Sequence, residues 1–274
     1  MKTRIISGAV LCLVVAAVVW IGMSFFAPVL TGFIAVVAAI AVYEMLRNAA
    51  GIAGAFPVVA GMAATVAAVF CLDGVWPEGP AWLDVYAVFL LYGLLIVVYS
   101  LARHTVFGLR EIAVSLAFPI VLSYAFSCIL FLVGHGGNIG LFYLLMLLNC
   151  SAVCDTGAYF TGVAFGKHKL CEKISPKKTV EGAAGGILLS VAVSLLLVCT
   201  LGKGHSIPAI LLFTVPLCAV GICGDLFASV MKRSVGLKDY GFLIPGHGGI
   251  MDRFDSILLI APVLNFLVDA GVLH

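Results

Sequence analysis

The sequence predicts an all-α fold, a polytopic bundle of transmembrane helices, from its composition and from the length of its apolar runs. Apolar residues make up 63% of the 274 positions and charged residues 10%, whereas soluble domains are about half apolar and about a quarter charged. A helix needs about 20 mostly apolar residues to cross a bilayer, and such runs follow one another along this chain. A soluble fold of this length cannot hide so much apolar surface, so we expect the chain to lie in a membrane.

About nine crossings can be laid out along the chain. They cover 5–22, 25–46, 55–72, 82–101, 111–133, 138–158, 183–201, 207–227 and 254–272. Only Met23 and Ser24 divide the first two runs, and Pro28 lies early in the second, so a helical hairpin or a re-entrant element stays open there. No small-x-small cleavage site follows the first run, which we therefore interpret as a membrane anchor and not as a secretory signal.

The positive residues predict the orientation of these crossings. When the runs alternate from the N-terminus, 14 of the 15 Lys and Arg residues fall on one side and only Lys203 falls on the other. Short cytoplasmic loops are enriched in positive residues, so the N-terminus is predicted to be cytoplasmic. A basic face beside a bilayer meets anionic lipid headgroups first, which favours the bilayer as a partner and argues against nucleic acid.

Polar residues divide the chain into two regions of different character. Residues 1–135 are predicted to be N-terminal transmembrane helices with isolated charges, and 136–274 to be the catalytic transmembrane region. In the first region we interpret Glu44 as an interfacial carboxylate that pairs with Arg47 three positions on; the alternative is a site role. The nine cysteines include no C-x-x-C pair, and we interpret them as packing residues.

The first polar block, 155–182, combines Asp155 with five lysines and a Ser-Pro-Lys-Lys-Thr turn. The lysines could merely set the topology. Thr179, however, stands where it can cap the following helix. Free N–H groups at that helix start, beside Lys177 and Lys178, would make a phosphate cradle.

Two further blocks carry carboxylates at the same predicted face. Asp225, Ser229, Lys232 and Arg233 are spaced to form one polar stripe on a helix. Asp252 and Asp255 stand three positions apart, which places both on one face at a helix start. Converging aspartates suit Mg²⁺, and lysines beside glycine-rich turns indicate a polyphosphate substrate.

A long motif in these blocks resembles the signature of the phosphatidate cytidylyltransferase (CDP-diacylglycerol synthase) family. It reads Ser229-x-Met231-Lys232-Arg233-x4-Lys238-Asp239-x-Gly241-x2-Ile244-Pro245-x-His247-Gly248-Gly249-Ile250-x-Asp252-Arg253-Phe254-Asp255. The resemblance covers about residues 150–260. The chain departs from the family at Ala228, where an acidic residue is common, so that position offers no ligand here.

The resemblance implies a reaction of CTP with phosphatidate to give CDP-diacylglycerol and pyrophosphate, in a bacterial-type cell membrane with the active site on its cytoplasmic face. It implies Mg²⁺ as the cofactor, alone or with a second cation at the same site. The expected metal ligands are Asp155, Asp225, Asp252 and Asp255. The expected catalytic residues are Asp225, Lys232, Arg233, His247, Asp252, Arg253 and Asp255. The expected substrate-binding residues are Lys167, Ser175, Lys177, Lys178, Thr179, Ser229, Lys238, Gly248 and Gly249.

Two other functions would produce part of the same residue pattern. A CTP-dependent polyprenol or lipid kinase would also bind the nucleotide near basic loops. A cation transporter would carry intramembrane acids, although near the bilayer midplane. The Gly182-x3-Gly186 motif allows either self-association, as in a homodimer, or close packing within one chain.

Overall fold

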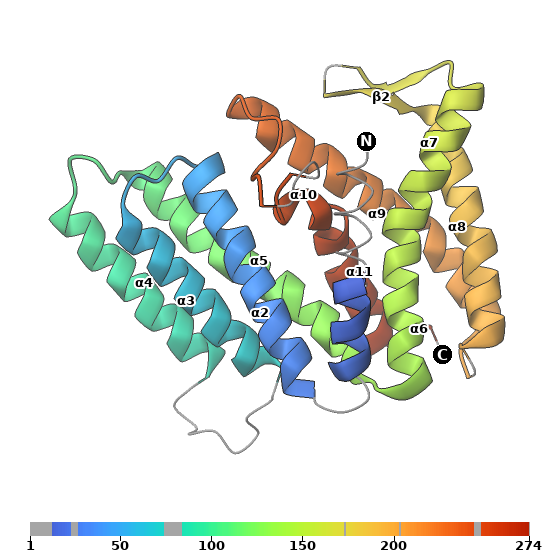
Figure 1. The fold of residues 1–274 in the computed structure, drawn as a ribbon, viewed down its shortest axis with the longest axis horizontal. Coiled ribbons are helices and arrows are strands. Elements are labelled where there is room, and N and C mark those ends of the chain that lie inside the picture. Colours follow the sequence, from blue (N-terminus) through green and yellow to red (C-terminus); the bar gives the residue numbers. More distant parts are fainter. Residues whose placement is uncertain are drawn as a thin grey trace. The chain divides into compact units, whose positions relative to one another are not determined.

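The computed structural model describes residues 13–22, 27–73, 84–172, 174–202, 204–243 and 248–273. In this part of the chain, seven helices are long and apolar enough to cross a membrane (Figure 1). They are Ala27–Ala49, Ala55–Leu72, Val85–Ala102, Leu109–Gly134, Gly137–Phe165, Val180–Thr200 and Ile207–Ser234. The predicted all-α polytopic membrane bundle is thereby confirmed.

Two shorter apolar helices, Leu13–Gly22 and Ile257–Asp269, coincide with the first and last predicted runs. The 13 residues of the latter span about 20 Å at 1.5 Å per residue, less than the hydrocarbon core of about 30 Å. Nine crossings and a cytoplasmic N-terminus therefore stay predictions. The crossings predicted to end at residues 158 and 227 belong to helices that are longer than predicted. These helices continue through polar residues to Phe165 and Ser234.

The elements follow in a simple order along the chain. They are α2 (Ala27–Tyr43), η1 (Glu44–Ala49), α3 (Ala55–Leu72), α4 (Val85–Ala102), α5 (Leu109–Gly134), α6 (Gly137–Leu148), η2 (Asn149–Val153), α7 (Cys154–Phe165), β1 (Lys169–Cys171), β2 (Ser175–Thr179), α8 (Val180–Thr200), α9 (Ile207–Ser234), α10 (Met251–Phe254) and α11 (Ile257–Asp269). The segments η1 and η2 are π-helical. Such widened turns inside α-helices are frequent at functional sites.

The chain forms two compact units, one of residues 1–130 with 235–253, the other of residues 131–234 with 254–274. In the first unit α3 packs against both α2 and α4 (Figure 1). Segment 235–253 belongs to this unit although it follows α9 of the second. Asn48 of η1 helps to hold it, since its Nδ2 donates to the Tyr240 carbonyl at 2.7 Å. The predicted division of roles between 1–135 and 136–274 stays a prediction.

In the second unit, α7 and α8 pack closely through glycines. A Cβ on Gly186 would overlap the Cys154 carbonyl oxygen, and one on Gly182 would lie 2.7 Å from the Ala158 carbonyl oxygen. The Gly182-x3-Gly186 motif is therefore used for contact within the chain.

A polar network joins η2, α8 and α9 inside this unit. The Asn149 amide donates to the Ser190 carbonyl at 3.0 Å and to Ser194 Oγ at 2.8 Å. The Thr214 hydroxyl donates to the same Ser194 Oγ at 2.9 Å. All four residues are buried, so these bonds supply partners that lipid cannot offer.

The lysine-rich block folds as a β-hairpin, which the sequence analysis did not predict. β1 and β2 pair antiparallel, with Lys169 opposite Thr179 and Cys171 opposite Ser175. Figure 1 shows the hairpin beyond the ends of α7 and α8, the two helices that it connects. Pro176 fits this short two-stranded ribbon, because an edge position needs no ladder N–H from it.

The glycine contact between α7 and α8 yields a stability test. A Gly186→Ala variant should lose about 1–3 kcal/mol through overpacking, which lowers the melting temperature by about 2–10 °C. Thermal unfolding of the purified protein in detergent measures this. Gly93→Ala in α4 is the control, because a Cβ there meets nothing within 4 Å; an equal drop in both variants would contradict the assigned contact.

Candidate active site

Three carboxylates and two ammonium groups lie close together in the second unit. Asp155 comes from α7, Lys178 from β2, Asp225 and Lys232 from α9, and Asp255 from the turn between α10 and α11. Lys178 Nζ forms an ion pair with Asp225 Oδ2. Asp155 interacts electrostatically with this pair, and Asp255 interacts with Asp225, Lys232 and Asp155. Like charges are thus held together with few counter-charges, an arrangement typical of functional sites.

A glycine next to the ion pair lets Asp255 approach α9. A Cβ on Gly224 would lie 2.9 Å from the Asp255 carbonyl oxygen, so a larger residue would push the turn away. The Asp255 carboxylate accepts the Ser256 N–H at 2.8 Å. The negative charge of Asp225 acts unfavourably on the Asp255 carboxylate, and the positive charge of Lys232 opposes this effect. This carboxyl therefore gains from any added positive charge.

The predicted polar stripe lies on one continuous helix, as expected. Asp225, Ser229 and Lys232 of α9 are all half-buried, whereas Arg233 is exposed near the end of that helix. Because these positions are spaced about one turn apart, the half-buried side chains follow a single face. The stripe supplies both an acid and a cation to the cluster.

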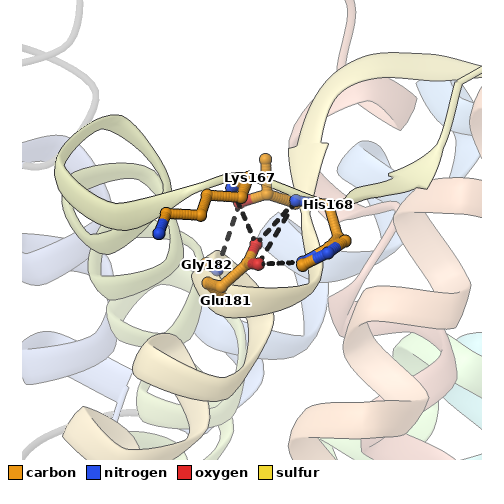
Figure 2. A network of polar contacts seen from close by, with 5 residues as sticks. Lys167, His168, Glu181 and Gly182 are labelled. Carbon is orange, nitrogen blue, oxygen red and sulfur yellow. Dashed lines mark hydrogen bonds and ion pairs between the residues drawn. The ribbon is translucent and has the colours of Figure 1, made fainter.

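The base of the hairpin is held by Glu181, the second residue of α8. Its carboxylate accepts the backbone N–H groups of Lys167 and His168 at 3.1 Å, and His168 Nδ1 lies 2.5 Å from Glu181 Oε1. Figure 2 shows the carboxylate pointing toward the chain that leaves α7. The hairpin is therefore tied at one end to the start of α8.

Thr179 caps α8, and three glycines lie close to its hydroxyl oxygen. Its Oγ1 accepts the Gly182 N–H at 3.1 Å, which confirms the predicted cap. A Cβ on Gly162, Gly166 or Gly182 would lie 2.8–2.9 Å from that oxygen. The Val180 N–H donates to the His168 carbonyl at 2.9 Å, so the prediction of free N–H groups at this helix start is wrong at Val180 and Gly182. The hairpin itself uses these donors.

In the first unit, Asp252 organises the glycine-rich loop that precedes it. Asp252 Oδ2 accepts the N–H groups of Tyr240 at 2.8 Å and Gly249 at 3.0 Å. Gly248 has a φ of +84°, and a Cβ there would lie 2.9 Å from Asp252 Oδ2. Glycine is needed at Gly248 both for this backbone conformation and for this close approach.

The predicted pair between Glu44 and Arg47 is wrong. Arg47 Nη1 donates to the carbonyls of Ile52 at 2.9 Å and Ala53 at 2.7 Å. Glu44 is buried and accepts the N–H groups of Ile250 and Met251. Sequence spacing suggested a neighbour on the same helix, whereas this carboxylate binds a loop about 200 positions away.

A family model described as "Cytidylyltransferase family" matches residues 2–270. The chain belongs to the cytidylyltransferase family.

Three relatives of this cytidylyltransferase family member carry the name phosphatidate cytidylyltransferase. They come from Staphylococcus epidermidis, Staphylococcus saprophyticus and Staphylococcus aureus, and are 46%, 44% and 43% identical over 129 residues. The match covers 47% of this chain and 50% of each relative. The chain thus spans about half the length of the curated relatives that it matches.

The structure of this cytidylyltransferase family member brings some of the predicted site residues together in two groups. Asp155, Lys178, Asp225, Lys232 and Asp255 form the cluster in the second unit. Gly248, Gly249 and Asp252 form the loop in the first. Of the other predicted residues, Thr179 caps α8, Ser175 and Ser229 are half-buried, and five are exposed, namely Lys167, Lys177, Arg233, Lys238 and Arg253. His247 lies outside the described residues.

The described residues hold no group of three or more His, Cys, Asp or Glu side chains arranged to bind a metal ion. Asp252 and Asp255 are three positions apart in the sequence, but their carboxylates contact different parts of the protein. Asp252 binds amides of its own loop, while Asp255 belongs to the second unit. The predicted ligand set of Asp155, Asp225, Asp252 and Asp255 therefore stays a prediction.

Two carboxylates that hold backbone segments were not predicted to do so from the sequence, namely Glu44, for which a site role was only the alternative, and Glu181. For Glu44 a signal existed, because an ionisable residue inside an apolar helix is costly unless it has a specific partner. Glu181 follows the predicted cap Thr179 by two positions, where an acid at a helix start is ordinarily explained by the helix dipole. Neither pattern says which distant backbone the carboxylate will bind.

The hairpin contact gives a test that does not depend on activity. A Glu181→Gln variant should loosen the hairpin, because an amide cannot replace a carboxylate that accepts several N–H groups. Limited trypsin digestion should then cleave several-fold faster within 167–178, since cleavage follows the open population. Glu172→Gln, an exposed change in the same hairpin, is the control and should leave the rate unchanged.

Proposed function

We propose that this chain is a phosphatidate cytidylyltransferase, which transfers the cytidylyl group of CTP to phosphatidate. The observation that carries the proposal is the cluster of Asp155, Lys178, Asp225, Lys232 and Asp255 in a chain of the cytidylyltransferase family. The names of the staphylococcal relatives supply the substrate class. The product is CDP-diacylglycerol, made in a bacterial-type cell membrane with the active site on its cytoplasmic face.

The reaction needs charge neutralisation more than a protein nucleophile. An oxygen of the phosphatidate phosphate forms a bond to the α-phosphorus of CTP. The bond from that phosphorus to the oxygen bridging the α- and β-phosphates breaks, and pyrophosphate leaves with the electron pair. Because nucleophile and leaving group are both anions, catalysis consists mainly of positioning and electrostatic stabilisation.

The cations of the chain have distinct proposed tasks. Lys178 and Lys232, which are half-buried, would face the reacting phosphates, where a less polar environment strengthens their field. The exposed Lys167, Lys177 and Arg233 would collect the triphosphate and the lipid headgroup from solution and from the membrane surface. Lys238 and Arg253 join this second group.

Mg²⁺ is the proposed cofactor, because the donor atoms of the cluster are of the type that it prefers. Asp155, Asp225 and Asp255 offer the hard oxygen donors that Mg²⁺ prefers, and these carboxylates share two ammonium groups. They would hold the ion, with Asp252 as the remaining predicted ligand. Bound Mg²⁺ neutralises phosphate charge and helps to align an in-line displacement.

A product assay tests the proposed function directly. The purified protein, reconstituted with phosphatidate and labelled CTP, should form CDP-diacylglycerol and release pyrophosphate, and EDTA should stop both. Release of CDP together with a phosphorylated lipid would instead indicate a lipid kinase. Turnover of neither substrate, with cation flux into vesicles, would indicate a transporter.

An Asp225→Asn variant tests the cluster. It removes a proposed metal ligand and leaves Lys178 without its carboxylate, so turnover should fall by about 10²-fold or more. The Mg²⁺ concentration for half-maximal rate should also rise. Asp269→Asn is the control, because that carboxylate only accepts from Asn265 at 3.2 Å in the contacts described. Unchanged turnover in Asp225→Asn would remove Asp225 from the site.

A further inference from the structure

Glu44 is a buried carboxylate whose hydrogen bonds run to the backbone of a distant loop. It is 2% exposed and begins the π-helical segment η1. Its Oε1 accepts the Ile250 N–H at 3.0 Å, and its Oε2 accepts the Met251 N–H at 2.8 Å. Both oxygens thus bind successive amides immediately before Asp252, so the contact depends on the path of the backbone and not on loop side chains.

Two glycines allow the loop to close around this carboxylate. A Cβ on Gly241 or on Gly249 would overlap Glu44 Oε1. Both glycines are buried, and neither has a positive φ. The close approach of Glu44 therefore explains why both positions are glycine, because neither backbone conformation requires it.

The same loop is held from two directions. Asp252 Oδ2 accepts the N–H groups of Tyr240 and Gly249, and Asn48, four residues after Glu44, donates to the Tyr240 carbonyl. Two carboxylates and one amide thereby fix four N–H groups and one carbonyl between Tyr240 and Met251. A loop anchored in this way presents Asp252 in one orientation.

We propose that Glu44 is a positioning residue, which anchors segment 248–252 and so sets the orientation of Asp252 for the reaction. The inference rests on the proposed function for its kinetic consequence. A glutamine at this position would turn an NH₂ group toward one of the two loop amides, where two donors would face each other. The loop would then shift, and a shift of about 1 Å near a reacting group can cost about 10²-fold in rate.

Two measurements on the whole protein in detergent test the role of Glu44. Hydrogen–deuterium exchange tests the anchoring of 248–252, and kinetics test its effect on turnover. In Glu44→Gln, peptides covering 248–252 should exchange about tenfold faster or more, because the anchored amides open more often. For folded protein, kcat should fall by about tenfold or more while KM for CTP and phosphatidate stays within about threefold. Arg47→Gln is the matched control, since Arg47 also makes two backbone bonds from η1, but to Ile52 and Ala53.

A second variant tests the same contact if Glu44→Gln does not fold. Gly241→Ala keeps the carboxylate but displaces it sterically, so it should raise exchange at 248–252 and lower kcat in the same direction. Unchanged exchange in both variants, or faster exchange with unchanged kcat, would overturn the inference. If the wild-type protein releases no pyrophosphate, the proposed function fails, while the exchange data still decide whether Glu44 anchors the loop.

Discussion

Lipid offers no hydrogen-bond partners, so every polar group carried by an apolar helix must find one within the protein. This constraint links the features that matter most in this chain. Lys178 pairs with Asp225, Asn149 binds Ser190 and Ser194, and Glu44 binds loop amides. In these three cases a polar group joins a helix to one particular neighbour, and two of the contacts involve candidate site residues or the loop that carries Asp252.

Glycines make these ties sterically possible. Gly162, Gly166 and Gly182 surround the Thr179 hydroxyl, whereas Gly241 and Gly249 accommodate Glu44. In each case the side chain that needs a partner approaches a backbone more closely than a Cβ would allow. Glycine-rich motifs in a phosphate-handling protein suggest loops that touch a ligand. Here several of them are explained by contacts inside the protein.

The contiguous signature from Ser229 to Asp255 is divided between the two compact units. Ser229, Lys232 and Arg233 belong to the second unit, residues 235–253 to the first, and Asp255 again to the second. The two π-helical segments stand next to acidic residues, since Glu44 begins η1 and Asp155 follows η2 within two positions. Widened turns beside both acids agree with the tendency of π-segments to occur at functional sites.

The sequence alone determined the fold class, the positions of the long helices, the cap at Thr179 and the stripe on α9. These follow from apolar length and residue spacing, which are local properties of the chain. Tertiary structure decided the partners of Glu44 and Lys178, the hairpin, and the occupied N–H groups at the start of α8. Glu44 and Ile250 are 206 positions apart, and no local pattern encodes which distant amide a buried carboxylate will meet.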